Sequence, residues 1–232
     1  FGRYLGLPRE DLTILAWGTL FFDIGKVKLP AELLKKPSSY TEDEFTIIKK
    51  HVEYSAQLIQ EMKEIPEEAA EIAWTHHERF DGNGYPMGLK ESAIPVFGRI
   101  AGIVDTYDAI TNIRPHAQPL SPHDAIKKLY QWRNTAFLEE LIEAFIQCLG
   151  IYPIGTLVEL TTGQVGIVIS QNRTRRLRPK ISLILDSKKV SYGISPVIDL
   201  IRETEDDNGN PLGIKNVLTP GSYGIDQNKY YL

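Results

Sequence analysis

Apolar residues recur at helical spacing through the first two thirds of this chain. Thr41 and Glu44 have the spacing of a capping box, which marks the start of a helix. An apolar stripe follows at intervals typical of a buried helix face, and comprises Phe45, Ile48, Val52 and Ile59. The same pattern predicts helices over residues 11–22, 67–77, 96–111, a segment opened by Ser121-Pro122, and 136–149 with Thr135 as its cap. We therefore expect residues 1–150 to form a helical bundle domain.

The periodicity changes near Gly150. Short β-type runs at 156–160 and 165–170 flank Thr-Thr-Gly-Gln, which signals a hairpin, and residues 181–186 alternate like a third strand. Residues 151–200 are therefore predicted to form a small antiparallel module. Residues 201–232 are polar and rich in turns, and we expect them to wrap the surface. The predicted fold class is mainly α, a helical bundle (1–150) followed by a small antiparallel β module with a C-terminal tail (151–232).

Composition excludes several classes of protein. The chain has 232 residues, 42% of them hydrophobic, so it can bury a sizeable core. Its formal net charge of −4 disfavours binding to a nucleic-acid polymer. A single cysteine rules out an internal disulfide framework and fits a cytoplasmic location. No apolar run approaches the roughly 20 residues that a membrane span needs, and no signal peptide is visible.

The segment HHERFDGNGYP at residues 76–86 carries the strongest chemical signal. Imidazole is the commonest protein ligand of transition metals, and His76 and His77 are adjacent. Gly82, Gly84 and Pro86 predict a tight loop beside them. The segment therefore indicates a metal site under a stiff loop, whereas the plainer interpretation is a helix end followed by a glycine turn.

Other candidate ligands are distributed along the helical region. Asp23 and Asp105 stand among apolar neighbours, where a carboxylate is costly unless it is paired or bound to a metal. His51 lies beside the apolar stripe, where a lone histidine is more often a core residue. Carboxylates and imidazoles converging from separate helices would form a dinuclear site. We expect His116 and His123, which lie in a proline-rich connection, at the surface.

The sequence resembles the HD-GYP family, bacterial phosphodiesterases that hydrolyse cyclic di-GMP. The resemblance covers about residues 5–130 and rests on FDIGK at 22–26, KH at 50–51, HHERFDGNGYP at 76–86, GRI at 98–100, DTYDA at 105–109 and RP at 114–115. It implies an all-helical HD core and cyclic di-GMP as the ligand. It also implies one or two divalent transition metal ions, iron or manganese, which would activate water for attack on the phosphorus.

The resemblance assigns roles position by position. The metal ligands it implies are Asp23, His51, His76, His77 and Asp105. Asp23 and Lys26 match catalytic positions, and Lys26, Arg114 and Tyr85 match positions near the substrate. Gly84, Tyr85 and Pro86 match the loop that names the family, which implies a contact with a diguanylate-cyclase-type partner domain.

One position departs from the family pattern. The histidine of the HD pair is Phe22 here, and phenylalanine cannot coordinate a metal. A further Glu/His ligand pair, expected on an upstream helix, is not clearly visible in this chain. Two hypotheses follow. The first is a metal-dependent cyclic di-GMP phosphodiesterase, whose activity the missing ligand would reduce or abolish. The second is a degenerate cyclic di-GMP receptor or protein-interaction scaffold in bacterial signalling.

A basic run in the β module comprises Arg173, Arg175, Arg176, Arg178 and Lys180. Its spacing does not match the Arg-x-x-x-Arg motif of cyclic di-GMP-binding PilZ domains. We interpret it as a solvated hairpin edge or a contact to a partner domain, because few aromatic residues accompany it as nucleic-acid binding would require.

Overall fold

The computed structural model of the chain describes residues 1–112, 118–172 and 174–230. It divides into two compact units. The helical unit comprises Phe1–Gln118 and Lys128–Phe145, and the β unit comprises Pro119–Lys127 and Ile146–Leu232. A helical fold followed by an antiparallel sheet confirms the predicted fold class. The domain boundary near residue 150 stays a prediction.

Helices make up nearly all of the regular structure up to residue 149. They are α1 (Arg9–Phe21), η1 (Ile24–Lys28), α2 (Ala31–Leu34), α3 (Glu42–Lys49), α4 (His51–Glu61), α5 (Glu68–Thr75), η2 (Glu91–Ala93), α6 (Val96–Thr111), α7 (Pro122–Gln131) and α8 (Glu139–Leu149). None of the helices in the described residues is long and apolar enough to cross a bilayer.

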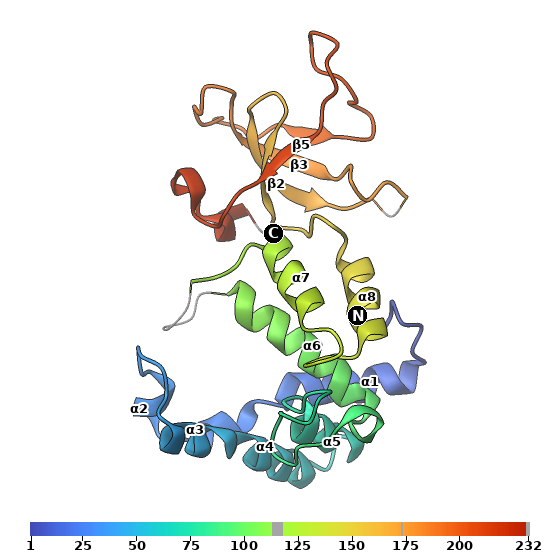
Figure 1. Cartoon of the computed structure of the whole chain (residues 1–232), viewed down its shortest axis with the longest axis vertical. Coiled ribbons are helices and arrows are strands. Elements are labelled where there is room, and N and C mark those ends of the chain that lie inside the picture. The colour runs from blue at the N-terminus through green and yellow to red at the C-terminus, as the bar shows by residue number, and fades with distance from the viewer. Residues whose placement is uncertain (113–117, 173, 231–232) are drawn as a thin grey trace. The chain divides into compact units, whose positions relative to one another are not determined.

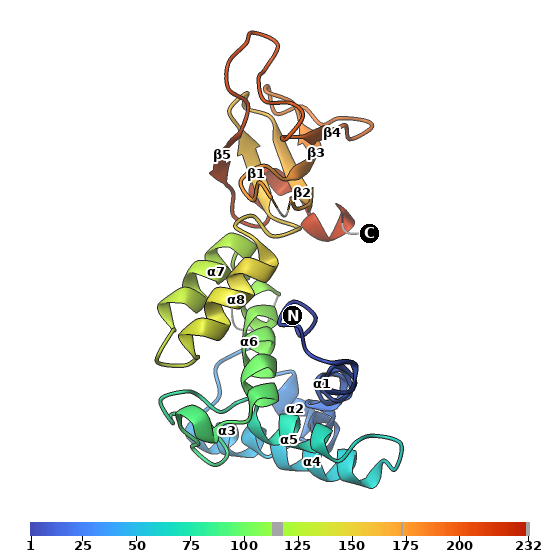
Figure 2. The ribbon, with the colours of Figure 1, turned by 90° about the vertical axis from the view of Figure 1, so that its right-hand side faces the viewer.

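The short helix α5 is the centre of the helical unit. It packs against α1, α4 and α6, as Figures 1 and 2 show from two directions. Small side chains make this possible, because Ala69, Ala70 and Ala73 are at most 2% exposed. A Cβ on Gly18 of α1 would lie 2.3 Å from the Ile72 side chain, so this glycine permits close approach of α1 to α5. The C-terminus of α5 is thereby fixed deep in the unit.

The predicted capping box is confirmed at the start of α3. The Thr41 hydroxyl accepts from the Glu44 amide, and the Glu44 carboxylate accepts from the Thr41 amide. The apolar stripe, however, runs through two helices, because α3 ends at Lys49 and α4 begins at His51. Ile48, Val52 and Ile59 are buried, but Phe45 is 40% exposed, so its assignment to a buried face is wrong.

The last helix begins later than the sequence predicts. Thr135 does not cap this helix. Residues 132–137 instead form a turn in which the backbone N–H of Asn134 donates to the Phe137 carbonyl at 2.7 Å. The Arg133 and Asn134 side chains both donate to the Glu139 carboxylate, at 3.0 and 2.7 Å. These interactions satisfy polar groups ahead of the helix and delay its start to Glu139.

The β unit contains a five-stranded antiparallel sheet in the order β4-β3-β2-β1-β5. Its strands are β1 (Leu157–Leu160), β2 (Val165–Ser170), β3 (Lys180–Leu185), β4 (Val197–Asp199) and β5 (Ile214–Val217). The turns η3 (Ser222–Gly224) and η4 (Gln227–Tyr230) follow. The predicted hairpin joins β1 to β2, and Gly163 adopts the φ of +82° that its turn requires.

Both faces of this sheet are covered. The consecutive residues Leu157 and Val158 of β1 point to opposite faces and enter two different buried clusters. Leu200 and Leu212 cover one cluster, and Ile225 covers the other. The tail is therefore more than a surface wrap: β5 extends the sheet by pairing with β1, because a strand edge with unpaired amides and carbonyls was available there.

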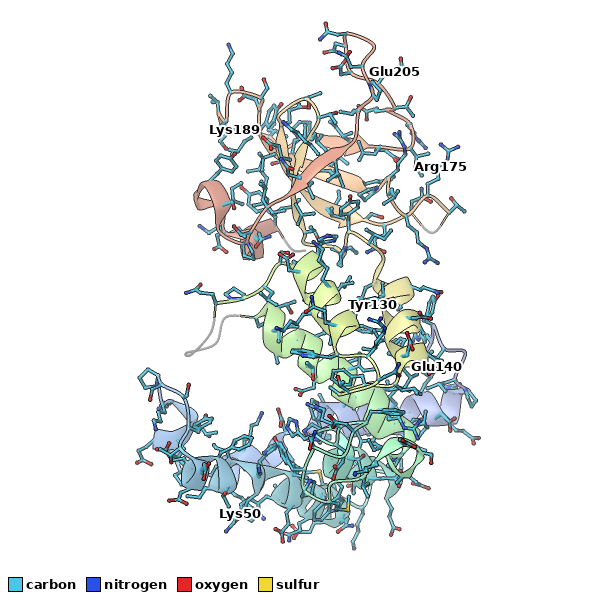
Figure 3. The ribbon with its side chains drawn as sticks, in the orientation of Figure 1. Lys50, Tyr130, Glu140, Arg175, Lys189 and Glu205 are labelled. Atoms are coloured by element: carbon cyan, nitrogen blue, oxygen red, sulfur yellow. The ribbon has the colours of Figure 1, made fainter. Side chains whose placement is uncertain are left out.

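The basic run lies around the connection from β2 to β3, and Arg173 is outside the described residues. Arg175 and Arg176 are exposed, and Figure 3 shows Arg175 projecting from this connection. Arg178 donates to the Leu200 carbonyl at 2.8 Å, and Lys180 pairs with Asp199 of β4 at 3.3 Å. Arg178 and Lys180 thus connect the start of β3 to β4 and to Leu200, which follows β4.

Candidate metal centre

Four predicted ligands come together from three places in the helical unit. Asp23 lies in the turn between α1 and η1, His51 begins α4, and His76 and His77 directly follow α5. Each offers one ligand atom, and these atoms all lie within 4.8 Å of one another. Asp23, His51, His76 and His77 could together hold a metal ion, and we refer to these four residues as the metal centre.

Glycines allow the segments to approach this closely. A Cβ on Gly25 would lie 2.3 Å from the His51 carbonyl oxygen, a distance that no side chain tolerates. The Gly25 amide instead donates to Ser55 Oγ at 2.8 Å, which fixes η1 against α4. A Cβ on Gly102 of α6 would lie 2.6 Å from the His76 carbonyl oxygen. Backbone contacts at these two glycines therefore position Asp23, His51 and His76.

Hydrogen bonds to the backbone fix the tautomers of two imidazoles. His51 Nδ1 lies 2.7 Å from the Ile48 carbonyl oxygen, and His76 Nδ1 lies 2.8 Å from the Ala73 carbonyl oxygen. A carbonyl oxygen only accepts, so Nδ1 must carry the proton in both rings. Each Nε2 then presents a lone pair. Metal-binding histidines commonly have this arrangement, with the second ring nitrogen bonded to a carbonyl or carboxylate.

The lone pairs of these rings point toward another acceptor. His51 Nε2 lies 3.2 Å from Asp23 Oδ1, and His76 Nε2 lies 3.9 Å from the same oxygen. Both imidazoles are at most 1% exposed. Within the described residues, none of these three buried atoms has a hydrogen-bond partner. Buried acceptors facing one another are unfavourable without a cation between them, so the donor set fits a divalent transition metal.

Charged neighbours complete the site. Lys26 donates to Asp23 Oδ2, the oxygen that faces away from the imidazoles. Burial raises the pKa of Asp23, but its polar and charged neighbours, Lys26 among them, lower it by more, so the carboxylate stays ionised. Asp105 of α6 lies outside the group of four and approaches it through His77, with Oδ2 3.9 Å from His77 Nδ1. Arg114 is outside the described residues.

Phe22 occupies the position beside this centre where a further ligand was expected. Its ring meets the His76 ring edge-on, with centroids 4.6 Å apart. It also packs against the buried alanines that join α4 to α5. Phe22 therefore contributes apolar contact and no donor atom to the metal centre.

The loop that follows His77 is anchored by a residue that sequence reasoning missed. Glu78 is 4% exposed, and its carboxylate accepts from the amides of Met87 and Leu89 at 2.7 and 3.0 Å. A Cβ on Gly84 would lie 2.3 Å from the Arg79 amide nitrogen, so only glycine fits there. The loop thus folds back tightly, and the Tyr85 ring stacks on the His77 ring at 4.6 Å. The signal available in the sequence was a carboxylate directly after the histidine pair.

We expect Glu78→Ala to loosen this loop. The change leaves two amides without their charged acceptor, which should lower the free energy of unfolding by about 2–4 kcal/mol. Urea unfolding measures the loss, and hydrogen exchange should accelerate at the Met87 and Leu89 amides. Glu71→Ala, at an exposed site on α5, is the matched control. Unchanged exchange at both amides would contradict the anchoring role.

The metal-free protein should lose stability on mild acidification. Burial lowers the pKa of His76 to about 3 and also lowers that of His77, so both rings stay neutral at pH 5 when folded. Unfolded histidines bind protons below about pH 6.5, so the free energy of unfolding should fall by about 2 kcal/mol per ring between pH 7 and 5. Asp23, whose pKa is lowered, affects stability only as pH falls through its unfolded value near 4 and below.

Urea unfolding in chelator at both pH values tests this expectation. His76→Gln should reduce the difference between pH 7 and pH 5 by about 2 kcal/mol, because it removes one of the two titrating rings. Equal differences in this variant and the original protein would show that His76 does not stay neutral in the fold.

Two family models match the sequence of this chain. The first, an HD domain, covers residues 1–138. The second, a KOW domain associated with the HD domain, covers residues 157–205 and so lies within the β unit. The helical unit and its metal centre therefore correspond to the HD domain.

Curated relatives share the sequence pattern. The cyclic di-GMP phosphodiesterase PA4108 of Pseudomonas aeruginosa is 32% identical over 205 residues, which cover 88% of this chain and 49% of that protein. A cyclic di-GMP phosphodiesterase of Thermotoga maritima is 35% identical, over 62% of this chain and 39% of that protein. A 3'3'-cGAMP-specific phosphodiesterase 1 of Vibrio cholerae is 38% identical, over 53% of this chain and 28% of that protein. The chain spans at most about half the length of these relatives.

A solved structure shares the fold. Bd1817, an HDG"Y"P protein from Bdellovibrio bacteriovorus, superimposes with a TM-score of 0.52 at 23% identity. The match covers 64% of this chain and 47% of that one. Together with the HD domain match over residues 1–138 and the HHE…DGNGYP segment beside the metal centre, these similarities place the chain in the HD-GYP family of HD-domain proteins.

Proposed function

We propose that this chain is a metal-dependent phosphodiesterase that hydrolyses cyclic di-GMP in the cytoplasm. The observation that carries the proposal is the convergence of Asp23 Oδ1, His51 Nε2 and His76 Nε2, three buried acceptors without a hydrogen-bond partner in the described residues. The names of the relatives support the reaction, and the buried donor set supports its dependence on metal.

Each residue then has a distinct task. The imidazoles of the metal centre and Asp23 would hold one or two ions, iron or manganese, and Asp105 would support His77. A divalent ion in such a site lowers the pKa of water and polarises phosphoryl oxygens. Lys26 neutralises charge that develops on the scissile phosphate. Arg114 and Tyr85 contact parts of the substrate other than the bond that is cleaved.

Phe22 favours a second candidate function. Its ring contacts His76 in place of a donor atom, so the centre would bind fewer ions or bind them more weakly. The chain would then be a receptor for cyclic di-GMP or a scaffold. In that case the Gly84-Tyr85-Pro86 loop would be the surface for a partner, such as a diguanylate-cyclase-type domain.

Metal content and turnover measured on one preparation decide between the two. We expect bound iron or manganese in the purified chain, loss of that metal with a strong chelator, and return of cyclic di-GMP cleavage when metal is restored. 3'3'-cGAMP serves as the competing substrate. A chain that binds cyclic di-GMP but never cleaves it, even fully loaded with metal, would support the receptor, and a chain that binds neither would refute both functions.

A further inference from the structure

We propose that Phe45 and Lys49 of α3 form, together with Tyr85, a clamp that binds a purine nucleotide beside the metal centre. In this arrangement Phe45 stacks on a base and Lys49 pairs with a phosphate. The inference rests on the proposed function, because it assigns the residues that recognise the substrate of the same site.

A row of aromatic rings leads from the metal centre to solvent. His77 belongs to the centre, and Tyr85 stacks on it with centroids 4.6 Å apart and an interplanar angle of 26°. Phe45 meets Tyr85 edge-on, with centroids 5.8 Å apart and an angle of 82°. The two rings therefore form a corner one ring away from a metal ligand.

The Phe45 ring is accessible to a ligand and is not part of the buried core. Its side chain is 40% exposed, although its neighbour Ile48 on the same helix is only 8% exposed. The exposed part of an aromatic ring gives a nucleobase a stacking platform. Purines stack on aromatic side chains regardless of their hydrogen-bonding edge.

Lys49 supplies a positive charge at the same corner. Its ammonium lies 4.7 Å from the centroid of Phe45 and 5.4 Å from that of Tyr85. In the part of the chain that the structure describes, no carboxylate pairs with it, whereas Lys26 and Lys36 pair with Asp23 and Glu44. A cation held only by two ring faces at the surface is weakly bound. It is therefore available for the phosphate of an incoming nucleotide.

Cyclic di-GMP matches these features. With one phosphate on the metal centre, a guanine that extends along the Tyr85 side would stack on Phe45. The second phosphate of the ring carries the charge that Lys49 would contact. The clamp would thus raise affinity for a cyclic dinucleotide without touching the bond that breaks.

The test compares dissociation constants and KM values for cyclic di-GMP in the full chain loaded with Mn²⁺. Phe45→Ala should weaken binding about 10-fold, Phe45→Trp should preserve it, and kcat should change little. Phe45→Ala should not alter inhibition by inorganic phosphate, which has no base. Lys49→Met should weaken cyclic di-GMP binding about 5-fold and reduce its dependence on salt.

Matched controls lie on the same helix or directly after it. Ile47→Ala truncates a side chain that is 38% exposed, and Lys50→Met removes the neighbouring positive charge, marked in Figure 3. Neither should change the dissociation constant. If the original chain binds cyclic di-GMP and Phe45→Ala binds it equally well, the clamp is refuted while the proposed function stands. If the original chain binds no cyclic dinucleotide with its metal in place, both the clamp and the proposed function are refuted.

Discussion

His76→Ala is expected to lower the affinity of the chain for Mn²⁺ or Fe²⁺ by about 100-fold or more and to abolish turnover. Loss of a residue that merely orients a ligand costs about 10–100-fold, and His76 offers its own lone pair to the centre. That lone pair is fixed by the hydrogen bond from Nδ1 to the Ala73 carbonyl, in a ring with no exposure to solvent. Its loss therefore leaves the buried centre one donor atom short.

Metal titration by calorimetry and metal content per chain measure this effect. His123→Ala is the matched control, because it removes an imidazole that bonds to the Ile151 carbonyl in the β unit, whereas the metal centre belongs to the helical unit. Circular dichroism shows whether each variant remains folded. Full metal content in a folded His76→Ala variant would mean that the buried acceptors are not metal ligands.

Phe22→His is expected to raise metal content, by up to about one ion per chain, and to raise the rate of cyclic di-GMP hydrolysis. The new imidazole would lie beside Asp23 and in contact with the His76 ring, where Phe22 now packs at 4.6 Å. Replacement of the larger ring loses apolar contact with the buried cluster of α4 and α5, at a cost of about 1–3 kcal/mol in unfolding free energy. A metal bond would offset that cost only when metal is present.

Phe21→His is a close control for this substitution. Phe21 belongs to the same cluster and is also half-buried, but its ring stacks on Trp17. It should lose stability without gaining metal. If Phe22→His gains neither metal nor rate, the missing imidazole does not limit this protein, and the upstream ligand pair expected from the family becomes the explanation to test. Rapid turnover by the original chain with a full metal complement would show that Phe22 impairs neither metal binding nor catalysis.

Local sequence patterns determined much of the fold and pointed to the centre. Helical periodicity predicted Val96–Thr111 with its observed bounds, and the Thr41–Glu44 spacing predicted a capping box that forms as expected. A short β-type run after the Thr-Thr-Gly-Gln turn predicted Val165–Ser170 and the hairpin before it. These features depend on residues close in sequence, so local rules suffice. The adjacent histidines and the glycine loop likewise indicated a metal site, because they lie within one short segment of the chain.

Only the tertiary structure decided how distant residues act together. The tautomers of His51 and His76 depend on which carbonyls their helices present, and no motif encodes that. The role of Glu78 depends on a loop that returns nine to eleven residues later. Strand β5 pairs with β1 across more than fifty residues, although its own sequence is polar and short. Phe45 follows the apolar pattern of a core residue but is 40% exposed, because its ring meets Tyr85 of a distant loop and does not enter the core. Such contacts arise from packing between segments, and the sequence of each segment alone does not contain them.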